Sequence, residues 1–244
     1  MKKSKLNHHK IDILAFGAHP DDVEAGCAGF LLKAKKAGQT IGIVDLSLAE
    51  LSTNGTTKQR LKEAKAAAGV MGASFRENLK LANNFFFNSK KVQEKIIKVI
   101  RKYRPEIVLL PYHIDRHPDH QETPKLVWQA LFTSGLSMFK TDLPPHRPKY
   151  VFFYRLWYDF SPTFLLDISD VYEEKEKTIL CYKSQFVKNK HRKTTRDNEE
   201  SFLEYWRARH RTYGYDIGVK YAETYLSLTP LGLKDLNAVL PNYL

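Results

Sequence analysis

The chain has 244 residues, 43% of them hydrophobic, and a formal net charge of +12. This length suffices for a full hydrophobic core, and no apolar run reaches the roughly 18 residues that a membrane-spanning helix needs. The two cysteines, Cys27 and Cys181, are too few for a disulfide framework, and no signal-peptide core follows the basic N-terminus. We therefore expect a cytoplasmic protein without a membrane segment.

Apolar runs of strand length alternate with helical patterns over the first half of the chain. The expected strands are 11–17, 40–46, 78–81 and 107–111, and the expected helices are 23–37, 58–71, 89–103 and 125–132. This alternation predicts an α/β fold, a Rossmann-like, mostly parallel sheet with helices on both faces. The crossover rule then places the loops after strands 11–17, 40–46 and 107–111 on one rim of the sheet.

The pattern changes after Lys140, where a proline-rich break at 144–148 interrupts the alternation. Strands are expected at 150–157 and 164–168, and helices at 171–182 and 200–213. We see no long linker, repeat or low-complexity tract. We therefore predict a basic tail over residues 1–10 and a single domain over 11–244. Its core is 11–140, and a C-terminal α+β elaboration, 141–244, covers the active rim.

The basic residues are spread along the chain, with one denser, polar stretch from Lys188 to Arg196. A charge of this size is compatible with nucleic acid, a membrane surface or an acidic small molecule. Because no RNA-binding or zinc-finger motif accompanies it, we do not expect nucleic acid as the partner. The stretch itself is typical of a solvated loop.

Two clusters of histidine and aspartate each follow an expected strand. The first reads Ala18-His19-Pro20-Asp21-Asp22-Val23-Glu24, and the second reads Asp115-Arg116-His117-Pro118-Asp119-His120. In open α/β sheets, ligands bind outside the carboxyl ends of the strands, which is where both clusters fall. A buried core does not require such residues at these positions, so the clusters are the main functional signal of the sequence.

The clusters together offer a set of metal ligands and an acid–base pair. His19 and Asp22 are three residues apart and project to one side, and we expect His120 to arrive from the neighbouring loop. Two histidines and one aspartate with an open position make the ligand set of a catalytic zinc site. Asp21 is then free to take a proton from a water whose pKa the metal lowers. His117 could donate to an oxyanion, and Asp119 could hold the His117 ring.

Other interpretations of these residues stay open. Asp21 or Asp22 could simply cap the following helix. Two histidines and a carboxylate also resemble the facial triad of iron oxygenases, although those sites usually lie in β-rich barrels. Arg116 fits a structural ion pair as well as a substrate contact. His113 and His146 are expected in loops, away from any metal, and Phe85–Phe87 in the core or a subunit interface.

The two motifs together resemble the signature of the PIG-L/LmbE-like zinc N-deacetylases. That resemblance implies a Rossmann-like fold and removal of the acetyl group from N-acetylglucosamine conjugates. Four further segments are similar to the branch of this family in bacillithiol biosynthesis, which acts on N-acetylglucosaminyl malate. These segments are 14–19, 49–56, 182–186 and 218–223.

By this resemblance, His19, Asp22 and His120 hold the metal, which is Zn²⁺, with Fe²⁺ possible in the same ligands. Asp21 is the general base, His117 stabilises the oxyanion or acts as acid, and Asp119 orients His117. Arg60 matches an arginine that faces the substrate. Further substrate contacts are expected from the similar segments, at Ser52, Asn54, Lys183 and Gln185. Family members form homo-oligomers, often hexamers, so we expect assembly here as well.

This sequence also departs from the family pattern. Asn83 stands where the family often has an acidic residue, which predicts an altered substrate contact. The 188–196 stretch is more basic than usual, which suits either a dicarboxylate such as malate or a solvated loop.

We therefore expect a metal-dependent deacetylase of a small amino-sugar conjugate, first of all N-acetylglucosaminyl malate. Diacetylchitobiose is the alternative substrate. A basic nucleic-acid-binding protein with a vestigial metal site and an iron-dependent oxidase are the rival classes.

Overall fold

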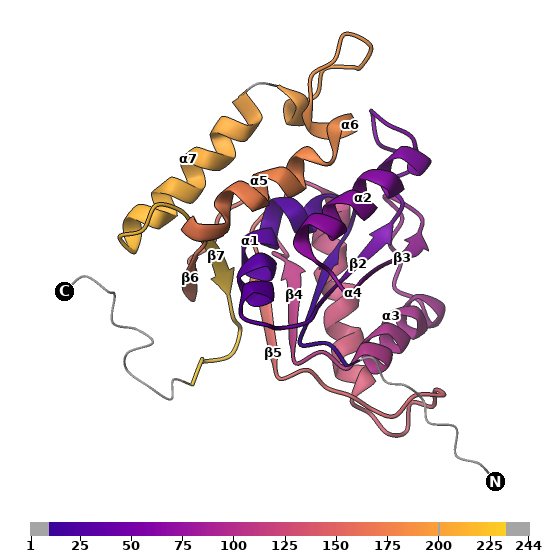
Figure 1. The fold of residues 1–244 in the computed structure, drawn as a ribbon. Helices are drawn as coiled ribbons and strands as arrows, with labels where there is room; N and C mark the ends of the chain where they lie inside the picture. Colours follow the sequence, from indigo (N-terminus) through magenta and orange to yellow (C-terminus); the bar gives the residue numbers. More distant parts are fainter. Residues whose placement is uncertain (1–9, 200, 233–244) are drawn as a thin grey trace.

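A computed structural model describes residues 10–199 and 201–232, which form a seven-stranded mixed sheet flanked by helices (Figure 1). The strands lie in the order β3-β2-β1-β4-β5-β7-β6. Five of them pair in parallel: β1 (Ile13–Gly17), β2 (Ile41–Ser47), β3 (Phe75–Leu81), β4 (Ile107–Pro111) and β5 (Tyr150–Tyr154). The antiparallel strands β6 (Phe164–Asp167) and β7 (Ala222–Leu226) complete the sheet. The predicted fold class is confirmed.

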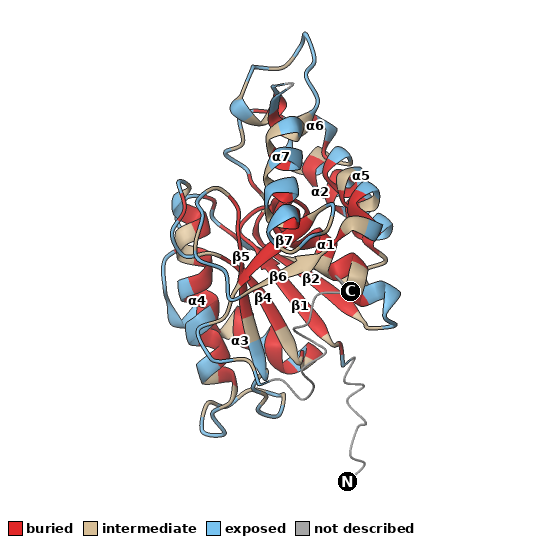
Figure 2. Ribbon diagram, turned by 90° about the vertical axis from the view of Figure 1, so that its left-hand side faces the viewer, coloured by how far each residue is buried: buried red, intermediate tan, exposed pale blue. Residues whose placement is uncertain are grey.

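Helices cover both faces of this sheet, because its central strands are buried on both sides. One face carries α1 (Asp22–Lys36), α2 (Thr57–Met71) and α5 (Tyr172–Leu180), and the other carries α3 (Lys90–Tyr103) and α4 (Pro118–Ser134). Alternate residues of β1 feed the two cores: Ile13 and Ala15 belong to one, Leu14 and Phe16 to the other. Figure 2 shows the buried strands between the exposed outer surfaces of the helices.

The C-terminal part of the chain extends the same sheet and also covers one end of it. Strands β5, β7 and β6 continue the sheet beyond β4. The short helix α6 (Lys183–Phe186) and the helix α7 (Ser201–Asp216) follow α5 in the chain, and the 3₁₀ turns Ser169–Val171 and Arg196–Asn198 precede α5 and α7. Among the described residues, no helix is both long and apolar enough to cross a membrane.

Several expected boundaries differ from the structure. The helix expected at 125–132 begins at Pro118, because His117 caps it and Pro118 occupies a first-turn position where its missing N–H costs nothing. The strand expected at 78–81 begins at Phe75. Helix α7 continues through Gly214 to Asp216, and β7 was not predicted as a strand. Ser89 does cap α3 as expected, accepting the Val92 N–H.

Candidate active site

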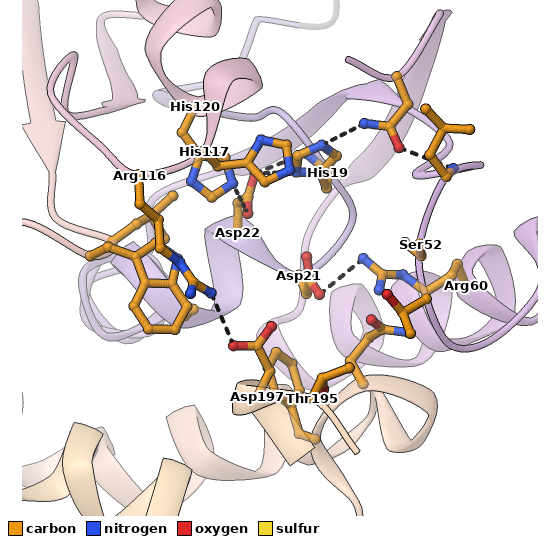
Figure 3. A pocket seen from close by; sticks show the side chains of 18 of the residues that line it. His19, Asp21, Asp22, Ser52, Arg60, Arg116, His117, His120, Thr195 and Asp197 are labelled. Atoms are coloured by element: carbon orange, nitrogen blue, oxygen red, sulfur yellow. Dashed lines mark hydrogen bonds and ion pairs between the residues drawn. The ribbon is translucent and has the colours of Figure 1, made fainter. Parts of the chain in front are cut away.

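A cavity of about 390 Å³ lies at the carboxyl ends of β1, β2 and β4, with residues of α6 and α7 on its far side. It is open at the mouth, and Figure 3 shows the two predicted clusters meeting in it. Because β1 pairs with both β2 and β4, the loops that follow these strands are neighbours in space. The chain therefore brings together His19, Asp21, Asp22, Arg60, His117 and His120, all of which line the cavity.

His19, Asp22 and His120 converge as the spacing predicted. The Asp22 carboxylate accepts the His19 backbone N–H at 2.8 Å and lies 3.6 Å from His19 Nδ1. Its other oxygen lies 3.1 Å from His120 Nε2. All three residues are buried. His120 lies in the first turn of α4 rather than in a loop, so a helix sets the direction of its side chain.

The outer nitrogen of each histidine faces a second carboxylate. His19 Nε2 lies 3.0 Å from Asp119 Oδ2, and His120 Nδ1 lies 2.9 Å from Asp115 Oδ1. An ionised carboxylate only accepts, so each of these ring nitrogens donates. The neutral forms of both rings then direct a lone pair toward Asp22. This is how metal-ligating histidines are held, and the donor set fits a divalent cation with an open coordination position.

The pKa shifts of His120 and Asp22 also fit a cation site. Burial favours the neutral ring of His120, but Asp22 and Asp115 outweigh it and raise the pKa of His120 to about 10. Burial likewise disfavours charge on Asp22, yet the neighbouring histidines hold the pKa of its carboxyl well below the usual range. Without a cation, a proton on His120 offsets the buried negative charge. A divalent cation would displace that proton and take over its role.

His117 lies beside the other two histidines but in a different hydrogen-bonding state. Its Nδ1 accepts the Asp119 backbone N–H at 3.1 Å as the N-cap of α4. The proton of the neutral ring is therefore on Nε2. Burial, together with positive charge on His19 and His120, lowers the pKa of His117 to about 4, which keeps the ring neutral. Donor atoms of the three histidines lie within 4.8 Å of one another. In this tautomer, Nε2 of His117 is a hydrogen-bond donor.

Asp21 does not cap α1, the simpler role that remained open for it. Its side chain makes no cap hydrogen bond, and one of its oxygens lies 2.9 Å from Nη2 of the buried Arg60. The same nitrogen donates to the carbonyl oxygen of Pro20. Burial raises the pKa of Asp21 to about 7 although Arg60 opposes the shift. A carboxyl group with this pKa can take up and release a proton near neutral pH.

We expected the Asp119 carboxylate to hold the His117 ring, but in the structure it does not. Its side chain accepts from His19 Nε2, from Asn83 Nδ2 at 2.6 Å and from the Asn84 backbone N–H at 2.8 Å. Only its backbone N–H contacts His117. Asn83 in turn accepts the Leu51 N–H through its side-chain oxygen. The amide that departs from the family pattern therefore contacts Asp119 and also lies next to the His19 ring, with Asn83 Nδ2 3.0 Å from His19 Nε2.

Three of the expected substrate residues line the cavity, namely Ser52, Arg60 and Gln185. Asn54 and Lys183 do not. The Asn54 amide instead pairs with the backbone of Lys193, donating to its carbonyl oxygen at 2.9 Å and accepting its N–H at 3.1 Å. Gln185 donates to the Asn54 carbonyl oxygen at 2.7 Å. These contacts join the loop after β2 to the basic stretch 188–196, whose Thr195 reaches the cavity.

Sequence reasoning did not assign Asp115 to the site. It is 4% exposed, and besides His120 it accepts the His117 backbone N–H at 2.9 Å and the Trp157 backbone N–H at 3.0 Å. Its place two residues before His117 was the available signal. Trp157 and Asp197 also line the cavity and were not predicted. The Arg116 guanidinium lies 3.5 Å above the Trp157 ring and 3.5 Å from Asp197.

The remaining aromatic and histidine candidates lie outside the cavity. His113 packs against Tyr112, and His146 Nε2 lies 2.7 Å from the Pro105 carbonyl oxygen. In the segment Phe85–Phe87, the middle ring is buried and the outer two are exposed.

Comparison with known proteins identifies the family. Residues 14–131 match the PIG-L family, described as GlcNAc-PI de-N-acetylase. The chain is 30% identical over 230 residues to the diacetylchitobiose deacetylase of Thermococcus kodakarensis, covering 86% of this chain and 80% of that protein. The chain belongs to the PIG-L family of deacetylases. The predicted family is confirmed at this level, and the bacillithiol branch stays a prediction.

Solved structures support the fold of this PIG-L protein. The conserved protein TT1542 from Thermus thermophilus superposes with a TM-score of 0.85 at 33% identity, covering 93% of this chain and 98% of that one. The diacetylchitobiose deacetylase from Pyrococcus horikoshii superposes with a TM-score of 0.79 at 24% identity, covering 92% and 87%.

Proposed function

We propose that this PIG-L deacetylase is a metal-dependent hydrolase that removes the acetyl group from an N-acetylglucosamine conjugate, most specifically N-acetylglucosaminyl malate. One observation carries the proposal. The outer nitrogens of His19 and His120 are both engaged by carboxylates, so their lone pairs converge on Asp22 beside an open cavity. His19, Asp22 and His120 would hold the cation, with zinc as the expected metal and Fe²⁺ as an alternative in the same donors.

When bound there, the cation polarises the amide carbonyl and lowers the pKa of a water. The protein side chains then move the protons. Asp21, whose pKa lies near 7, takes a proton from the attacking water. The neutral His117 donates from Nε2 to the carbonyl oxygen as negative charge develops on it. The C–N bond then breaks, and the proton held by Asp21 passes to the departing nitrogen. The products are the free amine and acetic acid, which ionises to acetate by releasing its proton to solvent.

The mouth of the cavity favours an anionic group on the sugar. Arg116 stacks on Trp157, and the Arg196 guanidinium lies 5.3 Å from the same ring. Asp197 pairs with Arg116 there, and Arg196, which is exposed and does not itself line the cavity, adds a second guanidinium beside the same ring. A malate carboxylate would find a cationic, aromatic surface, which a second neutral sugar does not require. Diacetylchitobiose is the second candidate, because it is the substrate named for the Thermococcus relative.

The decisive experiment measures acetate release from N-acetylglucosaminyl malate and from diacetylchitobiose, after metal analysis of the purified protein. We expect the malate conjugate to have the higher kcat/KM. Arg116→Leu should raise its KM and leave that of a neutral N-acetylglucosaminide unchanged. A higher kcat/KM for diacetylchitobiose would transfer the assignment to the second candidate. Absence of acetate release from either substrate by the metal-loaded protein would contradict both.

The base assignment has its own test. Asp21→Asn removes the proton acceptor but not the proposed ligands, so we expect turnover to fall by about 10²- to 10⁴-fold while bound metal stays stoichiometric. Turnover close to that of the wild type would show that Asp21 is not the base.

A further inference from the structure

Helix α1 is interrupted one turn after the residue that we assign as a metal ligand. Cys27 has φ −143° and ψ 17°, outside the helical region, so Asp22–Gly26 form a short turn of their own. Glycines flank the interruption where neighbours approach closely. A Cβ on Gly26 would lie 2.2 Å from the Tyr154 ring, and one on Gly29 would lie 2.6 Å from Ile168. The chain therefore bends here against β5 and the end of β6.

Such an interruption leaves backbone groups without their helical partners. Lys175, from α5, satisfies the carbonyl side: its Nζ donates to the carbonyl oxygens of Glu24 at 3.1 Å and Ala25 at 2.7 Å. Glu223, from β7, satisfies the amide side: its carboxylate accepts the N–H groups of Gly29 and Phe30, each at 2.8 Å.

The two side chains also bind each other. Lys175 Nζ lies 2.8 Å from Glu223 Oε1, and the Tyr225 hydroxyl donates to the other carboxylate oxygen at 2.6 Å. Both Lys175 and Glu223 are 1% exposed. One fully buried ion pair thus joins the two halves of the interrupted helix to α5 and β7.

We propose that the Lys175–Glu223 pair is a positioning device that holds the turn Asp22–Gly26 at the angle at which Asp22 meets His19 and His120. The proposal rests on Asp22 as a metal ligand. The turn begins with Asp22, and Ala25, whose carbonyl Lys175 holds, lines the cavity. In an uninterrupted helix, the Glu24 and Ala25 carbonyls would bind N–H groups along the helix axis, and the first turn would point elsewhere.

A role in stability alone does not account for this pair. Burying two charges is costly, and replacing a buried ion pair with apolar side chains is often neutral or stabilising. Here the Lys175 ammonium also binds two carbonyl oxygens of α1, and the Glu223 carboxylate binds two of its N–H groups. These backbone groups are free to bind side chains only in the bent conformation. The pair therefore selects one geometry of α1 over a straight one, and that geometry determines where the ligand carboxylate lies.

The test compares two buried cations that bind backbone carbonyls. Lys175→Met keeps the length of the side chain but removes the ammonium. Arg101→Met is the matched control, because Arg101 is also 1% exposed and binds the Ser134, Leu136 and Phe139 carbonyls away from the cavity. The readouts are the dissociation constant for Zn²⁺, measured against a chromophoric chelator, the melting temperature, and kcat and KM separately.

We expect Lys175→Met to weaken Zn²⁺ binding by about tenfold, the low end of the effect of residues that support ligands. It should lower kcat with little change in KM. Arg101→Met should lower the melting temperature and leave Zn²⁺ affinity unchanged. Equal Zn²⁺ affinity in Lys175→Met and the wild type, or equal losses in Lys175→Met and Arg101→Met, would overturn the proposal.

Two further variants keep the test decisive. Glu223→Gln preserves the shape but cannot accept both N–H groups, so it should repeat the loss of affinity if Lys175→Met does not fold. Unchanged affinity in Glu223→Gln would count against the proposal. Asp22→Asn distinguishes failure of the ligand assignment from failure of the positioning role. If Asp22→Asn binds Zn²⁺ as the wild type does, Asp22 is not a ligand. If Asp22→Asn binds Zn²⁺ more weakly while Lys175→Met and Glu223→Gln bind it normally, only the positioning role is refuted.

Discussion

Asp115 links most of the second cluster through one carboxylate. It binds the His120 ring, the His117 backbone and the Trp157 backbone. A carboxylate on the outer nitrogen of a ligand histidine fixes its tautomer and increases its basicity. Asp115 therefore determines which nitrogen of His120 faces Asp22.

We predict that Asp115→Asn weakens metal binding by roughly 10- to 100-fold, because a neutral amide supports the ring less well and cannot accept all three N–H groups. Competition with a chelator measures this directly. His113→Ala is the control, since His113 lies just beyond β4 and outside the cavity. Equal losses in the two variants would show that the effect is not specific to the His120 ring.

At this scale, the sequence identified the residue types of the site but not their partners. The spacing of His19 and Asp22 and the run His117–His120 were sufficient to bring the two clusters together. That Asp119 would bind His19 rather than His117 depends on the Asn83 loop after β3, which contributes both an amide and a backbone N–H. Such a contact between distant loops leaves no periodic pattern in the sequence.

At the scale of elements, the loop after β2 and the basic stretch 188–196 are joined mainly through Asn54. Its side-chain amide imitates a backbone peptide, with one hydrogen bond given to Lys193 and one received from it. Gln185 and Asn198 add bonds to the Asn54 and Lys193 carbonyl oxygens. The end of the basic stretch is thereby held at the mouth of the cavity.

We predict that Asn54→Asp releases this stretch, because a carboxylate cannot donate to the Lys193 carbonyl oxygen. Limited trypsin digestion should then cut within 188–196 several-fold faster than in the wild type, since accessible loops are the preferred sites of nicking. Thr53→Ser is a conservative control in the same loop. An unchanged cleavage rate would show that the stretch is held by its other contacts.

Some elements of this fold could be predicted from hydrophobic patterns in the sequence, and one could not. The long apolar or amphipathic segments, such as β1, β4 and α3, were predicted almost to their ends. The missed strand β7 reads Ala222-Glu223-Thr224-Tyr225-Leu226, and the glutamate at its second position argues against a buried strand. Glu223 can be buried because its carboxylate binds Lys175 and the backbone N–H groups freed by the interruption of α1. A strand stabilised by such distant polar partners cannot be predicted from local hydrophobicity.

At the scale of the whole molecule, the predicted core and elaboration share one sheet. Strand β5 extends the sheet from β4, and β7 follows β5. Tyr154 of β5 also donates to the Phe16 carbonyl oxygen of β1 at 2.7 Å. The part of the chain after Lys140 therefore completes the core rather than only covering it.

We predict that a fragment ending at Lys140 does not fold, because it exposes the edge of β4 and the face of α1 that α5 covers. Near-ultraviolet circular dichroism should show no fixed tertiary structure in the fragment, whereas the full chain should unfold in one cooperative transition. A folded, cooperatively melting fragment would contradict the single-domain prediction. Assembly into homo-oligomers stays a prediction, which a mass measurement in solution can check.

The backbone at position 21 limits which residues this site can accept. Asp21 has φ 125°, a conformation suited to glycine and costly for other residues, by about 1–3 kcal/mol. Both Asp21→Gly and Asp21→Ala remove the proposed base, but only glycine relieves this strain, so Asp21→Gly should melt at a higher temperature than Asp21→Ala. Selection for a robust fold and selection for turnover then favour different residues at one position, so inactive descendants of this chain are expected to acquire glycine there.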